Sequence, residues 1–207
     1  MTTESPPRAV GRSQAERTAA SRLELLNAAL EVLDESGFAG LTVADVCKRA
    51  GRTVGTHLHQ FGTKAALVAA AVDALAARRI ADARADLERE PRRGAEAALD
   101  VVWQFYAGPT FVVALELWVA ARTNPELREH LLTVEERIDR EGVALAASIA
   151  PELATPAGAL AGRYAVATMR GLAMRRALYV DADLDAEWRS LKPLLLTTLT
   201  AITPEEH

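Results

Sequence analysis

Residues 41–67 read LTVADVCKRAGRTVGTHLHQFGTKAAL and contain two short helical patterns followed by the start of a longer one. In residues 43–50, valines and an alanine recur at helical spacing until Gly51 ends the pattern. The second pattern covers residues 54–60, and the longer helix begins near Lys64 after a glycine and a threonine. Two short helices joined by a tight turn and packed on a longer helix are typical of a helix-turn-helix.

Two threonines indicate where the short helices begin. Thr42 is followed three residues later by Asp45, which is the spacing of a capping box with the shorter acid. Thr53 directly precedes the second short helix, where its side chain can accept a hydrogen bond from a free backbone N–H.

The residues before this segment predict one more helix, beginning near Arg17. Gly37 is a good C-cap and places the end of that helix near Ser36. Residues 1–16 are polar, contain two prolines and show no apolar period, so we expect a flexible N-terminal arm. The apolar face of the helix consists of leucines at spacings of three, four and three: Leu23, Leu26, Leu30 and Leu33.

Helical patterns also fill the chain beyond Lys64, separated mainly by prolines. Strong helix formers dominate the composition, and no window alternates β-branched with polar residues. We therefore expect an all-α protein of about nine helices. Residues 17–64 would form a three-helix domain and residues 65–207 a larger helical domain.

The charge of the chain is unevenly distributed. The formal net charge is −4, but residues 37–64 carry four basic residues and one acidic residue, a local charge of +3. A positive segment attached to an acidic body is typical of a DNA-binding module.

Several classes of protein are disfavoured. A single cysteine, Cys47, excludes an internal disulfide, and no apolar run approaches about 18 residues, so we expect a cytoplasmic protein without a membrane partner. No nucleophile–base pair or phosphate-binding glycine loop indicates an enzyme, and no cofactor is expected. His57 and His59 point in opposite directions on a helix and do not predict a metal site, while Cys47 is interpreted as a packing residue rather than a redox sensor.

Residues 22–67 resemble the DNA-binding domain of the TetR family of transcriptional regulators without a gap. The C-terminal part resembles the family only loosely, around residues 115–128 and the glycine and leucine at 171 and 172. The resemblance implies operator DNA as a partner. The matching residues are Arg22, Ala28, Ala29, Gly37, Phe38, Leu41, Thr42, Val43, Asp45, Val46, Ala50, Gly51, Thr53, Gly55, Thr56, Phe61, Lys64 and Leu67.

The resemblance also suggests which side chains contact DNA. Lys64 and Thr42 would bind phosphates, and Thr56 would reach a base edge or a thymine methyl group. The family commonly has a phosphate-binding tyrosine at the position of Leu58, which cannot donate, so either an altered operator preference or weaker DNA binding is expected. The expected DNA-binding residues are Thr42, Arg52, Thr53, Val54, Thr56, His57, His59, Gln60 and Lys64.

Large side chains gather in three segments of the second domain, where the family resemblance implies a cavity for a small-molecule effector. Glu116 lies inside an apolar helical segment and has two interpretations, a ligand anchor or a structural salt bridge, of which we favour the second. The candidate pocket residues are Trp103, Tyr106, Phe111, Glu116, Trp118 and Met169.

The last two helical segments, about 156–180 and 185–202, carry apolar faces that the resemblance assigns to a homodimer interface. The alternative is that both faces are buried within one subunit. The candidate interface residues are Tyr164, Gly171, Met174, Leu178, Trp188, Leu191 and Leu195.

These features together predict a ligand-responsive repressor that binds a near-palindromic operator as a homodimer and is released by an effector. Two recognition helices related by a dimer axis would lie about 34–36 Å apart, one turn of DNA. A dimeric interaction protein with weakened or lost DNA binding is the alternative.

Overall fold

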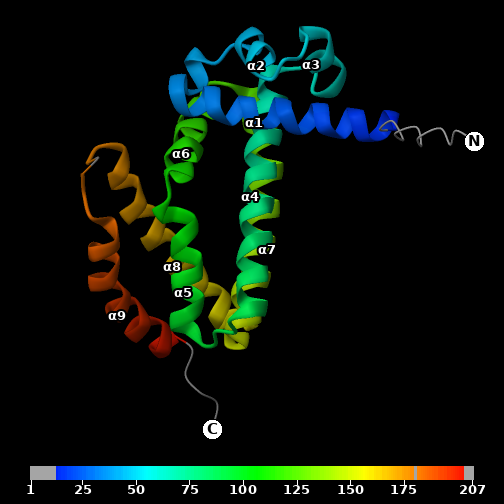
Figure 1. Cartoon of the computed structure of the whole chain (residues 1–207). Helices are drawn as coiled ribbons and strands as arrows, with labels where there is room; N and C mark the ends of the chain where they lie inside the picture. The colour runs from blue at the N-terminus through cyan, green and yellow to red at the C-terminus, as the bar shows by residue number, and fades with distance from the viewer. Residues whose placement is uncertain (1–12, 180, 203–207) are drawn as a thin grey trace, which may run out of the picture.

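The described part of the chain is all-α, as predicted. The computed structural model describes residues 13–179 and 181–202, and within them lie nine α-helices, two 3₁₀ turns and no strand (Figure 1). The elements are α1 (Gln14–Gly40), α2 (Val43–Arg49), α3 (Val54–Gln60), α4 (Lys64–Arg89), α5 (Ala95–Ala107), α6 (Pro109–Ala121), α7 (Pro125–Ile149), η1 (Pro151–Ala154), α8 (Pro156–Met174), η2 (Arg175–Ala177) and α9 (Leu184–Ile202).

The first helix begins earlier than the sequence predicted. The Ser13 hydroxyl accepts a hydrogen bond from the Glu16 nitrogen at 3.2 Å, and the Glu16 carboxylate accepts one from the Ser13 nitrogen at 2.6 Å. This reciprocal cap starts α1 at Gln14, so residues 14–16 are helical rather than part of the arm. The rest of the predicted arm, residues 1–12, lies outside the described residues.

The helix boundaries around the predicted helix-turn-helix agree closely with the sequence. Gly37 leaves the helical conformation within α1 at φ 66° and ψ 178°, a region that favours glycine. The observed bounds of α3 and the first residue of α4 are those expected from the threonines and glycines before them.

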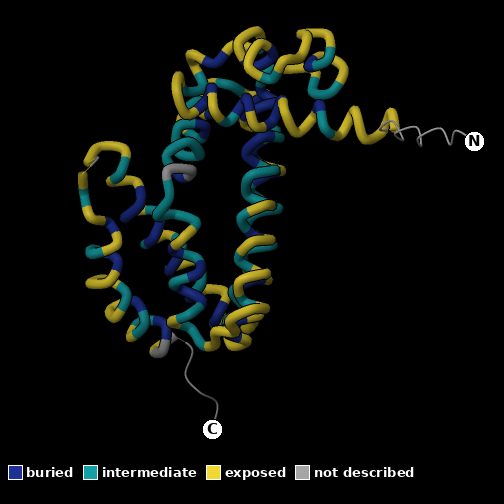
Figure 2. The backbone as a smooth tube through the Cα atoms, in the orientation of Figure 1, coloured by how far each residue is buried: buried dark blue, intermediate teal, exposed yellow. Residues whose placement is uncertain are grey.

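The two predicted domains share a hydrophobic core. Helices α1–α3 gather at one end of α4, and α4 and α7 run side by side away from them (Figure 1). Buried residues of α1, α2 and α4 form one cluster with Leu117 of α6 and Leu127 of α7. A second cluster lies between α5, α6, α8 and α9, whose outer surfaces carry many exposed residues (Figure 2). Helix α1 therefore packs directly on α6, which belongs to the second predicted domain.

An ion-pair network reinforces the α4–α7 contact. The Arg137 guanidinium donates to the Asp73 carboxylate at 2.6 Å, to the Asp73 carbonyl at 2.9 Å and to Glu141 at 2.7 Å. Multiple charge-assisted bonds to one arginine fix the relative position of the two helices more tightly than an exposed single pair.

Among the described residues, no single helix is both long enough and apolar enough to cross a membrane. Helices α5 and α6 meet the length and composition criteria only as a pair, and they are bent by 66° relative to each other.

Candidate functional site

A threonine caps the N-terminus of each of α2, α3 and α4. The hydroxyl oxygens of Thr42, Thr53 and Thr63 accept hydrogen bonds from the backbone nitrogens three residues further on, at 3.1, 3.2 and 3.1 Å. Between the helices, Gly51 and Gly62 have φ values of 62° and 78°, which permit the tight turns. The segment therefore folds as a helix-turn-helix with α3 as the second helix.

Helix α3 presents only part of its surface outward. Val54, Gly55, Leu58 and His59 are exposed, and Thr56 is half-buried. Leu58 is 58% exposed, which leaves an apolar side chain on the surface where the family commonly has a tyrosine. The N-terminal half of α3 therefore contributes Val54 and Gly55 to the exposed surface.

The expectation that His57 contacts DNA disagrees with its position. Its side chain is 1% exposed, its ring stacks on Phe61 with centroids 6.0 Å apart, and its Nε2 lies 3.2 Å from the Thr63 carbonyl oxygen. The family that residues 22–67 resemble usually has a leucine at this position, and that apolar residue was the signal for burial. His57 is a core residue of the helix-turn-helix.

Arg52, two residues before α3, and Gln60, the last residue of α3, both contact side chains of α1. Arg52 forms an ion pair with Glu24 of α1 and donates to it from Nε at 2.6 Å. The Gln60 side chain donates to the Ser21 hydroxyl of α1 at 3.4 Å. Both side chains tie α1 to the helix-turn-helix; Arg52 is nevertheless exposed, and the DNA contacts expected of these two residues stay predictions.

Arg22 provides a further contact between α1 and α3. Its guanidinium carbon lies 4.4 Å from the centroid of the Phe61 ring, and its Nη1 donates to the Gln60 carbonyl at 3.4 Å. A cation over an aromatic face is attractive, so Arg22 holds the C-terminal end of α3 against α1.

Lys64 lies at the N-terminus of α4 and is partly buried. Its Nζ is 4.4 Å from the centroid of the Phe38 ring, and desolvation by burial lowers the pKa of the Lys64 amine. Phe38 in turn donates its backbone N–H to Glu116 of α6 at 2.5 Å. Lys64, a predicted phosphate contact, is thus connected through Phe38 to Glu116 of the second predicted domain.

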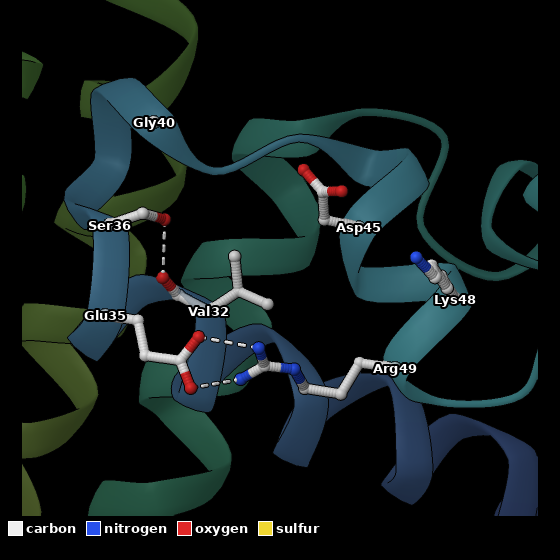
Figure 3. Close-up of a pocket in the computed structure, with 7 residues that line it drawn as sticks. All are labelled: Val32, Glu35, Ser36, Gly40, Asp45, Lys48 and Arg49. Atoms are coloured by element: carbon white, nitrogen blue, oxygen red, sulfur yellow. Dashed lines mark hydrogen bonds and ion pairs between the residues drawn. The ribbon is translucent and has the colours of Figure 1, made fainter.

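Two surface hollows flank the helix-turn-helix. The hollow in Figure 3, about 470 Å³, lies between the end of α1 and α2, where both nitrogens of the Arg49 guanidinium donate to Glu35 at 2.6 Å. The other, about 550 Å³, lies between α1 and α3, and its lining includes Arg17, Thr56 and His59. The second hollow adjoins the exposed surface of α3 and adds a basic residue of α1 to it.

Cys47 is buried on α2. Its thiol lies 3.5 Å from the Thr53 carbonyl oxygen, and desolvation raises the pKa of the Cys47 thiol. A buried thiol with a raised pKa is poorly reactive, which agrees with the interpretation as a packing residue.

Five of the six candidate pocket residues lie in the second hydrophobic cluster. Trp103, Phe111 and Met169 are buried in it, and Tyr106 and Trp118 pack against it. Glu116 does not join them, because its carboxylate faces Gly37 and Phe38 of α1. Glu116 therefore has the structural role favoured above, although its partner is a backbone N–H and not an arginine.

An arginine fills the space between two of these aromatic rings. The Arg170 guanidinium carbon lies 5.1 Å from the Trp118 ring centroid and 5.8 Å from that of Tyr106. Phe111 contacts both rings edge-on, with centroids 5.4 Å from Tyr106 and 5.8 Å from Trp118. Edge-on contacts of this kind leave the faces of the two larger rings available to a cation.

Two carboxylates of α7 complete the surroundings of Arg170. Glu135 lies 3.7 Å and Asp139 3.3 Å from its Nη2, and Glu135 also accepts a hydrogen bond from the Trp118 indole at 2.9 Å. Desolvation raises the pKa of Glu135, and the Trp118 hydrogen bond and Arg170 lower it by less. We call this set the Arg170 cage: Tyr106, Phe111, Trp118, Glu135 and Asp139 around Arg170.

The sequence interpretation missed Arg170 and Glu135. Arg170 interrupts an apolar segment of α8, which is the same signal that singled out Glu116 in α6. Glu135 lies in a charged stretch of α7 and carried no comparable signal.

The predicted dimer residues divide into two groups. Trp188 and Leu195 are buried within the subunit, so the alternative of internal packing holds for them. The Trp188 indole donates to Asp100 at 3.2 Å, and its ring stacks on that of Trp103 at 5.1 Å. The other five residues are exposed on α8, α9 and the turn after α8: Tyr164, Gly171, Met174, Leu178 and Leu191.

Comparisons with known proteins point to one family. The family described as "Bacterial regulatory proteins, tetR family" matches residues 25–71. The HTH-type transcriptional regulator CymR of Pseudomonas putida is 37% identical over 128 residues, which are 61% of this chain and 63% of CymR. The chain thus spans less than two thirds of that relative's length.

The similarity to two further proteins extends over more of the chain. The HTH-type transcriptional regulator BetI of Stenotrophomonas maltophilia is 30% identical over 171 residues, 80% of this chain and 85% of BetI. The solved structure of the multidrug binding protein EbrR complexed with ethidium matches this chain with a TM-score of 0.62 at 22% identity. The match covers 88% of this chain and 97% of the EbrR chain. That structural likeness concerns the fold alone.

Proposed function

The chain belongs to the TetR family of helix-turn-helix transcriptional regulators, and from this premise we propose that it is a homodimeric repressor released from its operator by a small molecule. Residues 17–64 would bind DNA, and residues 65–207 would bind the effector and form the dimer. The relatives reported above are regulators rather than enzymes, which accords with a binding function.

The exposed surface of α3 is the observation that carries the DNA-binding proposal. Its capped N-terminus presents Val54, Thr56 and His59 beside a hollow that Arg17 lines. In the proposed complex, Thr42 and Lys64 bind phosphates, and the exposed α3 side chains contact bases. With His57 buried in the core, sequence preference depends on fewer side chains than the resemblance implied, and the exposed Arg52 remains among the proposed DNA contacts.

The dimer is supported by an apolar surface on α8, α9 and the turn between them. Leu178 is 76% exposed and Leu194 67% exposed, and Tyr164 and Met174 of α8 are about half-exposed. Exposed apolar patches of this kind commonly mark association surfaces. A two-fold axis through this surface would present two copies of α3 to successive major grooves.

The effector proposal is supported by the Arg170 cage and by the likeness to EbrR, which was solved with ethidium. The cage lies in the second hydrophobic cluster, between helices α5, α6, α7 and α8. A ligand that changes the spacing of these helices changes DNA affinity if it binds the free and DNA-bound conformations unequally.

The proposal is tested by titrating the full chain against the DNA that flanks its own gene at two salt concentrations. A repressor gives saturable, sequence-dependent binding that weakens steeply as salt rises, because each phosphate contact releases a counterion. Scrambled DNA of equal length is the control.

One observation favours the alternative, an interaction protein without operator binding. Leu58 is exposed and cannot donate a hydrogen bond to phosphate. Equal and weak affinity for the flanking and scrambled DNA would support that alternative and contradict the repressor proposal. A Leu58→Tyr variant that gained sequence-dependent affinity would identify the residue responsible.

A further inference from the structure

The Arg170 cage has the composition of a cation-binding site, and its cation is supplied by the protein. The faces of Tyr106 and Trp118 approach the guanidinium at 5.8 and 5.1 Å, and Arg170 Nε lies 3.3 Å from the Tyr106 hydroxyl oxygen. Aromatic faces carry a negative quadrupole, so this arrangement stabilises positive charge.

The charges around the cage also favour a cation. Glu135 and Asp139 oppose the single positive charge of Arg170, so the set is negative overall. Burial raises the pKa of Glu135 in spite of the nearby arginine, which indicates that its charge is incompletely compensated. An anionic ligand would have to approach Arg170 past two carboxylates that already pair with it.

We propose that the effector is an organic cation with a flat cationic group, such as an amidinium or guanidinium attached to an aromatic ring, and that it binds by displacing Arg170 from between Tyr106 and Trp118. This inference rests on the proposed effector-responsive function. Glu135 and Asp139 pair with the incoming charge, and the released Arg170 turns toward solvent. Because Arg170 competes for the same space, the cage binds its ligand only in the fraction of molecules from which Arg170 has left.

The cage is connected to the DNA-binding helices through α6. Trp118 faces the cage, whereas Glu116, two residues earlier, points to the opposite side of the helix and accepts the Phe38 N–H. A cation that repositions Trp118 therefore acts on α6, the helix that contacts α1. By thermodynamic linkage, the cation changes the affinity for operator by the same factor as the operator changes the affinity for the cation.

The test uses three probes of one shape: benzamidinium, the neutral benzamide and the anionic benzoate. Each is titrated by calorimetry into the full chain without DNA. We expect saturable binding of benzamidinium alone. In Arg170→Met the affinity for benzamidinium should rise about tenfold, because the internal competitor is gone, and in Glu135→Gln it should fall about tenfold.

Two further variants control for a general effect of removing a positive charge from α8 and for loss of folding. Arg163→Met makes the same change two helical turns earlier at an exposed position of α8 and should leave the affinity unchanged. Arg170→Gln replaces Arg170→Met if the latter unfolds, as judged by circular dichroism.

The opposite results overturn the inference. Binding of benzoate to the native protein that is lost in Arg170→Met would identify Arg170 as the anchor of an anionic effector. A second contrary result is a folded Arg170→Met or Arg170→Gln protein that binds its operator but does not bind benzamidinium. That result would contradict the cation site and leave the repressor proposal intact.

Discussion

The Glu116 carboxylate lies 2.5 Å from the backbone nitrogen of Phe38 and joins residues separated by 78 positions in the chain. It approaches α1 where Gly37 interrupts the helix, and a β-carbon at Gly37 would collide with the carboxylate. This contact, together with Lys64 above the Phe38 ring, links α6 to the start of α4.

We expect Glu116→Ala to destabilise the protein by about 1–3 kcal/mol, because the partly buried Phe38 N–H loses its charged acceptor. Gly37→Ala should cost about 1–3 kcal/mol through its backbone conformation and displace Glu116 as well. Denaturant unfolding measures both changes. Gly142→Ala, in open space within α7, should instead stabilise by up to about 1 kcal/mol. Equal stability of native protein and Gly37→Ala would contradict the contact.

Lys64→Ala should weaken binding to operator and unrelated DNA by a similar factor and reduce the slope of log affinity against log salt by about 1. The reason is the loss of one phosphate contact without loss of any base contact. Arg78→Ala, an exposed position further along α4, is the matched control. A change confined to operator DNA would show that Lys64 contacts a base.

His57→Leu should raise the free energy of unfolding by about 1 kcal/mol without altering operator preference. The His57 Nδ1 is buried without a hydrogen-bond partner, and leucine removes that cost. His59→Leu, two residues away and exposed, should leave stability nearly unchanged and alter preference among operator sequences. The two measurements are denaturant unfolding and competition binding; the reverse pattern would exchange the roles of the two histidines.

Leu178→Glu and Leu194→Glu should convert the proposed dimer to monomers and weaken operator binding at least tenfold, because each introduces one charge per subunit into the proposed apolar interface. Analytical ultracentrifugation at several concentrations gives the oligomeric state. Val143→Glu, 61% exposed on α7, is the control and should remain dimeric. Dimeric behaviour of both leucine variants would exclude the α8–α9 surface as the interface.

Glu135→Gln should change the dependence of stability on pH. Burial raises the pKa of Glu135 in the folded protein above its ordinary value of 4.5. A raised pKa favours the protonated carboxyl in the folded protein. The free energy of unfolding of the native protein therefore falls relative to that of the variant as the pH rises from below 4.5 through the folded-state pKa of Glu135. Above that pKa the difference in unfolding free energy between the two proteins is constant. Thermal unfolding of both proteins from pH 4 to 8 measures this difference. A difference that changes in the opposite direction would mean that Arg170 dominates over burial.

The sequence was sufficient for the features that depend on neighbouring residues. Gly37, Gly51 and Gly62 and the threonines before α2, α3 and α4 predict the helix boundaries in this region, because a cap bonds to a backbone group three residues away and a positive φ is a property of one residue. The apolar periods likewise predict an all-α fold, and the segment at 22–67 predicts the family.

Only the tertiary structure decided which side chains share a site. Arg170 and Glu135 belong to different helices, and Glu116 meets Phe38 across 78 positions of the chain, so no local pattern encodes either contact. The ion pair of Arg52 and the hydrogen bond of Gln60 were likewise set by partners on α1 rather than by their own segment. Helical periodicity specifies the direction in which a side chain points, but the partner that it meets depends on how the helices pack.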